Sequence, residues 1–320
     1  PRYFQIRGIG ERSQYAGEGG PIYYVGTVID DIDMGGIGMP IFLDDVKQIE
    51  IYQGPQSYAY GHNAMAGIVN IKTLDPSTEQ YNKIKTTFGN HNKVNISNYN
   101  NLGDLFFKNL YINSFIQYNI EDGYIYNEYL QDYTNNKNEL SAKIKLLYKK
   151  PNFFQKLSLI HANLNNGYDA WSPNNNGEFS YSNEPGKDSQ KLYAGSLKSK
   201  ISIGNWTLLH IGTILHSNLE HNYDGDWGNN DFWANPPYNY EWDYEYYQQE
   251  LRERKMNTNE LRVAANNFIN QSSIKASNTF GLYMKNILEN DDANGWILGG
   301  EDVGLLSQYK INNYAIFNEL

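Results

Sequence analysis

The sequence lacks several residue types and patterns on which common protein functions depend. None of its 320 residues is cysteine, so disulfides, thiol nucleophiles and cysteine-based zinc sites are excluded. Charged residues make up only 19% of the chain and leave a net charge of −10, which argues against nucleic-acid binding because that function needs a basic face. No run of residues approaches the ~18–20 apolar positions of a membrane-spanning helix, and the mean hydropathy is −0.66.

The sequence carries no complete motif for a cofactor, a metal ion or catalysis. Gly8–Gly10 and Gly36–Gly38 lack the third glycine of a dinucleotide-binding loop, and no phosphate-binding loop occurs. Asp30, Asp31 and Asp33, with Asp44 and Asp45, could suggest a site for a divalent cation, but they do not follow the spacing of an EF-hand with its terminal glutamate. His210 and His216 would lie about 20 Å apart on one strand, too far to share a metal ion. We therefore expect no enzyme activity, no cofactor and no bound metal.

Aromatic residues are what the chain has in excess. It contains 28 tyrosines, and aromatic residues make up 15% of it. A disordered chain would lack these aromatics. Tyrosine and the abundant asparagine suit β-strands joined by long polar loops, and tyrosine also suits the boundary between membrane and water. The composition therefore favours a folded, strand-rich protein.

Residues 1–80 differ from the rest of the chain in composition and in the pattern of apolar residues. They are rich in glycine and contain only short apolar runs, at 23–32, 46–52 and 67–73. Glycine at this density serves turns, bulges and close approach of backbones. We expect a small mixed α/β domain here, with short strands and one short helix over residues 55–60.

From residue 81 onward, apolar and polar residues alternate in segments of about ten. Ile144 and Leu146 share one face of such a segment, whereas Lys143 and Lys145 share the other. Strict alternation predicts strands with one apolar and one polar face. On residues 205–219 the apolar-leaning face is formed by Thr207, Leu209, Ile211, Thr213 and Leu215. About ten strands are expected, near residues 82–90, 92–100, 109–121, 138–149, 154–166, 190–203, 205–219, 255–265, 278–288 and 308–320.

The connections between these strands alternate in length. Short links are expected at 101–108, 150–153, 204 and 266–277. Long polar links are expected at 121–137, 166–190, 220–254 and 289–307. Only the first link, at 89–92, is short out of turn. Such sorting is typical of a transmembrane β-barrel, which has short turns on one side and long loops on the other. The alternative is an ordinary antiparallel β-protein with a few functional loops.

Residues 1–80 contain four blocks with a recognisable pattern, Phe4–Gly10, Val28–Ile32, Phe42–Gln56 and Tyr60–Thr73. In this order the blocks resemble the plug domain of TonB-dependent outer-membrane receptors, closest to the iron-siderophore branch. The chain departs from the family pattern at Gln53 and His62. The positions that carry the plug motif are Gly8, Gly10, Asp30, Asp31, Gly54, Pro55, Gly61, Asn63 and Gly67.

The resemblance implies an architecture and a location. It implies a plug domain over residues 1–80, followed over 81–320 by antiparallel transmembrane β-barrel strands. About ten strands fall short of the family's barrel of roughly twenty-two, so we expect an incomplete barrel, the plug plus its first part. The TonB box and a signal peptide would then precede Pro1. The implied location is the outer membrane of a Gram-negative bacterium.

The resemblance also implies a function and partners. The implied function is active uptake of a scarce ligand, a ferric siderophore first of all. Uptake of cobalamin, haem or an oligosaccharide is the alternative within the family, and a passive porin or surface adhesin is the alternative of another class. The implied partners are the TonB energy-coupling complex of the inner membrane, the iron chelate or other nutrient, and outer-membrane lipid.

Two charged residues of the plug motifs stand out as candidates for a latch. Arg7 and Glu50 each place a charge in a domain that should pack inside a barrel, and a buried charge must be paired. Either they form a latch between plug and barrel wall that keeps the channel shut, or they form a plain structural ion pair.

The long loops are the candidates for ligand recognition. They interleave aromatic residues with acids and asparagines, which can stack on a planar ligand and accept its hydrogen bonds. They contain few Lys and Arg residues, which weakens the case for an anionic siderophore at these loops. The alternative is that the loops pack on one another over the barrel mouth. The candidate ligand-binding residues are Tyr168, Asp169, Trp171, Tyr223, Asp224, Trp227, Trp233, Tyr238 and Trp242.

Overall fold

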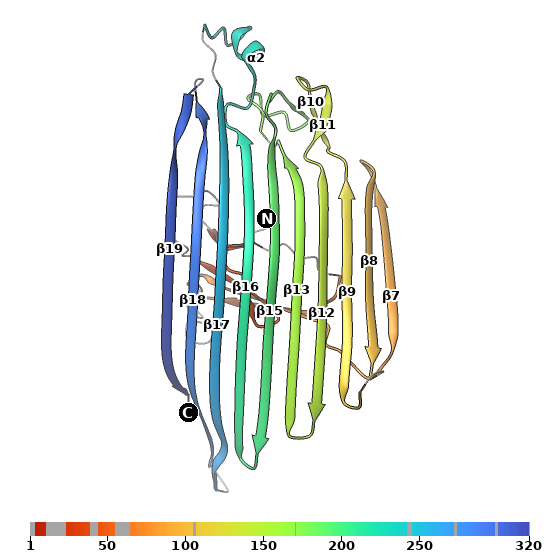
Figure 1. The fold of residues 1–320 in the computed structure, drawn as a ribbon, viewed down its shortest axis with the longest axis vertical. Helices are drawn as coiled ribbons and strands as arrows, with labels where there is room; N and C mark the ends of the chain where they lie inside the picture. Colours follow the sequence, from red (N-terminus) through yellow and green to blue (C-terminus); the bar gives the residue numbers. More distant parts are fainter. Residues whose placement is uncertain are drawn as a thin grey trace.

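One antiparallel sheet of ten long strands dominates the structure, a computed structural model (Figure 1). The structure describes residues 4–10, 24–38, 44–54, 65–104, 107–169, 171–241, 245–271, 274–297 and 300–319. We call the ten-stranded sheet the wall and the part of the chain that precedes it the plug. Of the helices in these described ranges, none is long and apolar enough to cross a membrane.

Each wall strand pairs with the next wall strand along the chain, so the sheet is a simple meander. Its edges are the first and the last strands, β7 and β19. The wall strands are β7 (Tyr81–Gly89), β8 (Lys93–Gly103), β9 (Leu110–Glu121), β12 (Lys137–Lys150), β13 (Phe153–Tyr168), β15 (Gly186–Ile203), β16 (Trp206–Asp224), β17 (Tyr246–Gln271), β18 (Ile274–Ile297) and β19 (Gly300–Glu319).

The plug lies against one face of the wall, behind it in the view of Figure 1. Its main sheet has the order β4-β3-β6-β5, with β3 and β6 parallel and the other pairs antiparallel. A ribbon of two very short strands accompanies it. The plug strands are β1 (Gln5–Ile6), β2 (Ile9–Gly10), β3 (Val25–Ile29), β4 (Ile32–Asp33), β5 (Val46–Gln53) and β6 (Gly67–Thr73).

Plug and wall share one hydrophobic core. Ile29 and Ile71 of the plug are buried in the same cluster as Ile160, Leu192 and Met256 of the wall. Burial of side chains of this size stabilises the contact by about 1.5–3 kcal/mol each. Apolar packing therefore holds the plug to the wall in addition to the polar contacts described below.

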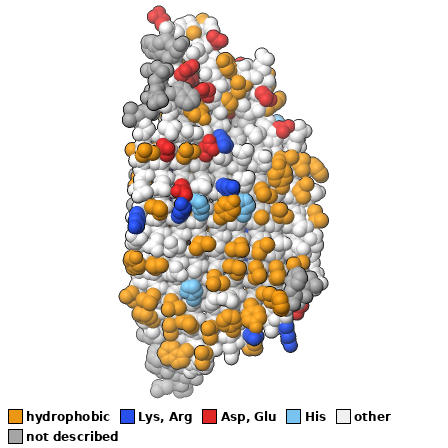
Figure 2. Space-filling view, viewed as in Figure 1, with side chains coloured by type: hydrophobic (Ala, Val, Ile, Leu, Met, Phe, Trp, Pro, Cys, Tyr) orange, Lys and Arg blue, Asp and Glu red, His pale blue; other side chains and the backbone are white. Residues whose placement is uncertain are grey.

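The two faces of the wall differ in chemistry, because side chains alternate along each strand. On β12, Lys143 and Lys145 point toward the plug and are buried, whereas Ile144 points away and is 45% exposed. Leu261 is likewise exposed, on the outward face. Figure 2 shows hydrophobic side chains spread over much of this outward face, with most acidic side chains toward the end that carries the long loops and Lys and Arg side chains at mid-height and at the opposite end.

In a transmembrane barrel the apolar face of each strand is expected to point outward to lipid, but the apolar-leaning face predicted for β16 points toward the plug. Leu215 is buried in the plug–wall core, and Ile211 lies on the same face of the strand. The outward face of β16 instead carries Leu208 and Ile214, which are exposed. Both faces of this strand hold apolar residues, so the alternation could not distinguish them.

All ten predicted strands are present, and the predicted antiparallel sheet is confirmed. The predicted long loop at 289–307 is wrong, because β18 runs to Ile297 and β19 starts at Gly300. The expected link at 266–277 is also largely strand. These three last strands pair over 23 and 18 residue positions in the two hairpins, farther than their apolar segments extend.

Three short strands and one short helix lie at the end of the wall that carries the long loops (Figure 1). They are β10 (Ile125–Asn127), β11 (Asp132–Thr134), β14 (Phe179–Ser180) and the short helix α2 (Asn230–Ala234). The helix predicted over residues 55–60 lies outside the described residues. The described part of the plug consists of strands and turns only.

Candidate functional site

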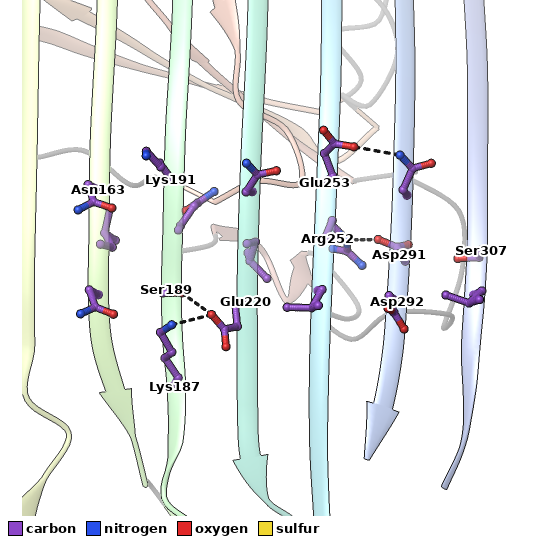
Figure 3. Close-up of a pocket in the computed structure, with 18 of the residues that line it drawn as sticks. Asn163, Lys187, Ser189, Lys191, Glu220, Arg252, Glu253, Asp291, Asp292 and Ser307 are labelled. Carbon is purple, nitrogen blue, oxygen red and sulfur yellow. Dashed lines mark hydrogen bonds and ion pairs between the residues drawn. The ribbon is translucent and has the colours of Figure 1, made fainter. Parts of the chain in front are cut away.

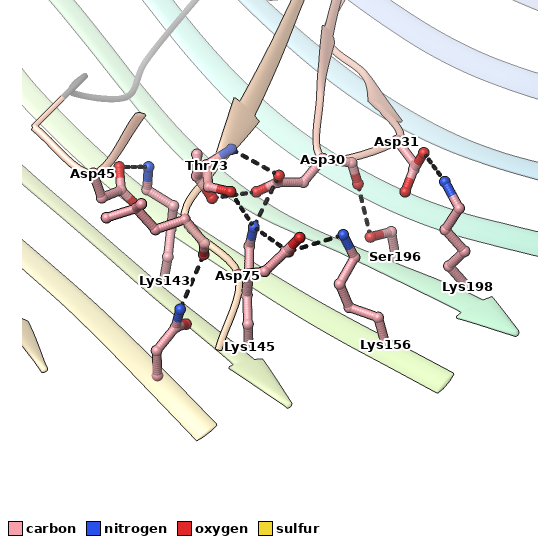
Figure 4. A network of polar contacts seen from close by, with 12 residues as sticks. Asp30, Asp31, Asp45, Thr73, Asp75, Lys143, Lys145, Lys156, Ser196 and Lys198 are labelled. Atoms are coloured by element: carbon pink, nitrogen blue, oxygen red, sulfur yellow. Dashed lines mark hydrogen bonds and ion pairs between the residues drawn. The ribbon is translucent and has the colours of Figure 1, made fainter. Parts of the chain in front are cut away.

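A set of ion pairs joins the plug to the wall. Within the described ranges, six wall lysines contact six plug aspartates, and Figure 4 shows several of these pairs. The contacts are Lys85–Asp44 at 2.7 Å, Lys143–Asp45 at 2.5 Å, Lys145–Asp30 at 2.9 Å, Lys145–Asp75 at 3.4 Å, Lys156–Asp75 at 3.0 Å, Lys198–Asp31 at 2.8 Å and Lys285–Asp33 at 2.5 Å.

The plug residues are positioned by a tight turn between β3 and β4. Ile29 pairs with Ile32, so Asp30 and Asp31 are the two turn residues. Both have positive φ angles, 48° and 72°, as a two-residue hairpin turn requires. Aspartate tolerates this backbone conformation better than most residues. The Asp-Asp pair therefore both makes the turn and presents two carboxylates to the wall.

Asp30 has a carboxylate that accepts three hydrogen bonds, two of them from Thr73 and one from Lys145. One oxygen accepts hydrogen bonds from the Thr73 backbone N–H at 3.0 Å and from Lys145 at 2.9 Å, and the other accepts from the Thr73 hydroxyl at 2.6 Å. The Asp30 carbonyl accepts a hydrogen bond from the Ser196 hydroxyl at 2.9 Å. This residue thus ties two plug strands to two wall strands.

A second group of contacts holds the segment that follows β4. Arg254 of the wall donates to the Gly35 carbonyl at 2.7 Å, and Gln190 donates to the Ile37 carbonyl at 2.7 Å. Arg254 also pairs with Glu289 of the neighbouring strand, and the two side chains are buried. Buried arginine next to buried glutamate keeps both charges paired.

The surroundings of the plug carboxylates shift their pKa in both directions. Burial by itself raises the pKa of Asp33, but the Lys285 ammonium and the hydrogen bonds from Lys285 and Gly35 together hold it below its usual value. Burial raises the pKa of Asp45 above its usual value, although Lys143 opposes this. Asp33 therefore stays ionised in mild acid more readily than Asp45.

The predicted latch residues lie elsewhere on the plug. Arg7 is exposed and donates to the Gln53 side chain at 2.8 Å. Glu50 accepts from Lys72 at 2.7 Å and from Asn70 at 2.8 Å. The contacts described for Arg7 and Glu50 are thus made within the plug. Glu50 lies on β5, at the edge of the plug sheet, and most of that strand is exposed.

The glycines of the plug motif have identifiable backbone roles where they are described. Gly8 and Gly54 have φ angles of 76° and 85°, which residues with a side chain adopt rarely. At Gly67 a Cβ atom would lie 2.3 Å from the Tyr52 carbonyl oxygen, so only glycine fits between β5 and β6. Pro55, Gly61 and Asn63 lie outside the described residues.

Among the predicted loop residues, Asp169 organises the loops from inside. It is 5% exposed, and its carboxylate accepts hydrogen bonds from Asn127 at 3.1 Å and Thr134 at 3.0 Å. It also accepts from the hydroxyls of Ser180 and Ser182. The four donors come from three segments, those around Asn127, Thr134 and Ser180–Ser182, so one buried carboxylate fixes the relative positions of these segments.

Two tryptophans from different loops stack on each other and remain exposed. The rings of Trp171 and Trp227 lie 5.9 Å apart with an interplanar angle of 25°, and their exposed fractions are 52% and 42%. Trp227 has a φ angle of 62°, stabilised by a 2.9 Å hydrogen bond from its N–H to the carboxylate of the buried Asp224. This pair offers a flat apolar surface that is already in place.

The other predicted loop aromatics mostly pack against each other. Trp233 is buried, donates to Asp226 at 3.2 Å, and has the rings of Tyr238 and Tyr240 within 5.4 Å. Tyr168 and Tyr223 both contact the ring of His221. Trp242 lies outside the described residues. Loop–loop packing, the alternative considered for these loops, thus accounts for part of the set.

Two hollows are lined by several charged side chains. One, of about 760 Å³, lies over the wall strands near the loops and is lined by polar residues including Lys187, Glu220 and Glu253 (Figure 3). There Lys187 pairs with Glu220 at 2.7 Å. The other, of about 640 Å³, lies between plug and wall and is lined by Asp31, Asp75, Lys156 and Lys198 among others.

No cluster of three or more His, Asp and Glu side chains in the part of the chain that the structure describes could hold a metal ion. The plug aspartates illustrate why, because lysine ammonium groups occupy the positions where a cation would bind. The site is therefore a contact in which lysines of the wall pair with aspartates of the plug, an arrangement suited to holding and releasing the plug.

The beginning of the chain matches a known family. Residues 1–68 match the family model described as TonB-dependent Receptor Plug Domain. These residues contain the Asp30–Asp31 turn and the aspartates Asp33, Asp44 and Asp45 that contact the wall. The match therefore covers most of the plug side of the contact.

Solved structures share the fold of nearly the whole chain. The ferric yersiniabactin uptake receptor FyuA from Yersinia pestis matches with a TM-score of 0.74 at 14% identity, over 93% of this chain and 52% of that chain. The siderophore receptor PiuA from Acinetobacter baumannii matches with a TM-score of 0.67 at 10% identity, over 91% and 47%. The ferric-catecholate import receptor Fiu from E. coli K12 matches with a TM-score of 0.63 at 12% identity, over 91% and 49%.

The resemblance to TonB-dependent receptors is confirmed for the fold. Residues 1–68 match the plug-domain model, and the chain as a whole has the fold of the plug and part of the barrel of the solved receptors. It spans about half the length of the solved structures that it matches. Those structures are receptors and not enzymes, in agreement with the expectation from the sequence.

Proposed function

We propose that this chain belongs to an outer-membrane receptor that takes up a scarce ligand, a ferric siderophore, with energy delivered by the TonB complex. In this proposal residues 1–80 are a mixed α/β plug and residues 81–320 are strands of the transmembrane barrel. The observation that carries the proposal is the contact between plug and wall, in which buried lysines of the wall hold aspartates of the plug.

The chemistry of the contact supports a plug that can be released from the wall. A buried ion pair is a weak source of stability compared with apolar packing, but it fixes one arrangement of its partners. Once the partners separate and are hydrated, each charge is stabilised by water instead. A plug held in this way is well seated at rest and can be released when the energy-coupling complex pulls on it.

The outward face of the wall supports a place in the membrane. It carries exposed Ile144 on β12, Leu159 on β13 and Ile214 on β16, as a lipid-facing surface requires. Outer-membrane lipid is therefore proposed as the partner of this face, in a Gram-negative bacterium.

The loops supply the proposed ligand site. Trp171 and Trp227 are proposed as direct contacts because their rings are exposed. Asp169 and Asp224 are proposed to position the loops, and Tyr168, Tyr223, Trp233, Tyr238 and Trp242 complete the proposed set. Arg7 and Glu50 remain proposed as residues that help to seat the plug, and the plug-motif residues as its framework.

Uptake of cobalamin, haem or an oligosaccharide remains the second candidate, since the loops hold few positive charges for an anionic chelate. A strain that lacks the gene should be compared with its parent for growth and uptake on ferric siderophores, free iron, cobalamin, haem and glycans. A defect confined to one ferric siderophore supports the proposal. A defect confined to another nutrient identifies that nutrient as the ligand. Steady ion conductance of the purified protein supports a porin instead.

A further inference from the structure

All the ion pairs that join plug to wall in the described residues have the same polarity. The six bases belong to the wall and the six acids belong to the plug. A contact that served only to hold the plug would work equally well with mixed polarity. With uniform polarity, the plug takes the negative charges with it when it moves, and the wall is left with a row of unneutralised lysines.

Space for a ligand already exists beside two of these lysines. The cavity of about 640 Å³ between plug and wall is lined by Lys156, Lys198, Asp31 and Asp75. This volume lies within the range of sites for small ligands. The cavity is on the side of the plug away from the long loops, since Lys156 and Lys198 lie near the short turns that join β12 to β13 and β15 to β16.

The charges in the cavity balance as long as the plug is seated. Lys198 pairs with Asp31, and Lys156 pairs with Asp75. The remaining wall charges, Arg262 and Glu260, pair with each other and stay together whatever the plug does. Withdrawal of the plug carboxylates therefore leaves Lys156 and Lys198 without partners, and the cavity surface formed by the ten-stranded sheet then carries a net positive charge.

We propose that this cavity is a transient binding site for an anionic metal chelate on its way out of the barrel, formed by Lys156 and Lys198 once Asp31 and Asp75 withdraw. The inference rests on the proposed uptake function and names the charge of the ligand. At rest the aspartates occupy the positions that the anionic groups of the chelate take later. The site is thus closed by the same contacts that seat the plug, and it opens only during transport.

The inference also accounts for a contrast within the molecule. The outer loops carry few positive charges, so they offer an anionic chelate little beyond stacking surfaces. The wall beneath the plug concentrates lysines, and a positively lined passage raises the local concentration of anions. An anionic ligand then has a favourable direction of travel, away from the acidic loops and toward the lysines.

Cysteine is absent from these 320 residues, which simplifies a direct test in which any cysteine elsewhere in the gene product is first replaced by serine. Ile211 lines the cavity and pairs in register with Lys198 on the neighbouring strand, so Ile211→Cys places a single thiol beside the proposed site. The assay measures the rate at which N-ethylmaleimide modifies this thiol in the purified natural gene product. The probes are hexacyanocobaltate(III), an anionic complex, and hexaamminecobalt(III), a cationic complex of the same metal.

Asp31→Asn with Asp75→Asn imitates the withdrawn plug carboxylates. In this background hexacyanocobaltate should slow the modification of the introduced thiol by about threefold or more, and hexaamminecobalt should not. Adding Lys156→Gln and Lys198→Gln should remove the protection. With all four charged residues unchanged, neither complex should protect.

The result that overturns the inference is equally specific. Absence of protection in the Asn background, or protection that survives loss of both lysines, excludes an anion site formed by Lys156 and Lys198. If the double Asn variant loses its strand signal in circular dichroism, Asp31→Asn alone serves, because the Lys198–Asp31 pair is partly exposed. The assay needs neither TonB nor the natural ligand, so its failure is distinguishable from failure of the proposed uptake function.

Discussion

Lys145 of the wall and Asp30 of the plug form a buried ion pair with an N–O distance of 2.9 Å, and both side chains are 2% exposed. The residues are 115 positions apart in the sequence. Asp30 is held from the plug side by Thr73, and Lys145 reaches it from an inward position of β12. The pair is therefore a fixed point between two parts of the fold that the proposed function requires to separate.

Removing the lysine of this pair should loosen the plug. Lys145→Met leaves the Asp30 carboxylate buried without its cation, which destabilises the seated plug by about 3–5 kcal/mol. The measurement is the urea concentration at which a protease begins to cut the plug of the purified protein. Lys72→Met is the matched control, because the Lys72 side chain is 48% exposed in its pair with Glu50 and an exposed pair contributes only about 0–1 kcal/mol. Equal shifts for both variants would contradict the assigned importance of Lys145.

The seating of the plug should weaken in acid through Asp33. Its pKa is lowered in the folded protein, so the stability it contributes is fully present above its unfolded pKa of about 3.9 and is lost as the pH falls through the lower folded value. The same protease assay across that range should show a decline for the parent. Asp33→Asn should be less stable at neutral pH and should decline less on acidification. A decline of the same size in both proteins would assign the acid effect to other groups.

The outward face of the wall should reject charge. Ile144→Arg and Leu261→Arg place a guanidinium on exposed apolar positions and should each destabilise the inserted barrel by about 2–4 kcal/mol if the positions lie near the bilayer midplane. Glu260→Gln, on the inward face, should have a smaller effect. The measurement is the amount of heat-stable protein recovered from outer membranes. Comparable losses for all three variants would refute the assignment of the faces.

We expect some loop residues to contact the ligand directly and others to hold the loops in position. Trp171→Ala removes half of the exposed stacked pair and should lower ligand affinity while the unfolding of the protein stays unchanged. Asp169→Ala removes the acceptor shared by Asn127, Thr134 and two serines and should lower both affinity and the protease resistance of the loops. Binding is measured on whole cells with the ferric chelate that the growth screen identifies. Unaltered affinity in Trp171→Ala would remove this tryptophan from the ligand site.

The alternation of apolar and polar residues predicted the wall strands correctly where one face is apolar and the other is polar, as on β12. It failed on the upper parts of β17 and β18, where both faces are polar. There Arg252 and Arg254 face inward and pair with Asp291 and Glu289 across the two strands. A strand with polar residues on both faces has the sequence pattern of a loop until its partner strand is known.

The plug–wall contact could be predicted only in part, for a related reason. Asp30 and Asp31 belong to a motif that the sequence shows, and the inward lysines of β12 fall on the polar face that alternation predicts. Their pairing depends on how the plug sits against the wall, which no local pattern encodes. Arg7 and Glu50 were singled out because each is a charge in the plug motifs, yet the structure gives them partners within the plug.

The central claim is that the plug must part from the lysines of the wall for uptake to occur. Asp31→Cys with Lys198→Cys introduces the only two thiols of the described chain, and a short reducible bis-methanethiosulfonate can join them where the ion pair stood. Binding and uptake of the identified ferric chelate are then measured on the same cells before and after reduction. The account predicts that cross-linked cells bind the chelate but do not take it up, and that reduction restores uptake. Normal uptake by cells in which the cross-link is complete would contradict it.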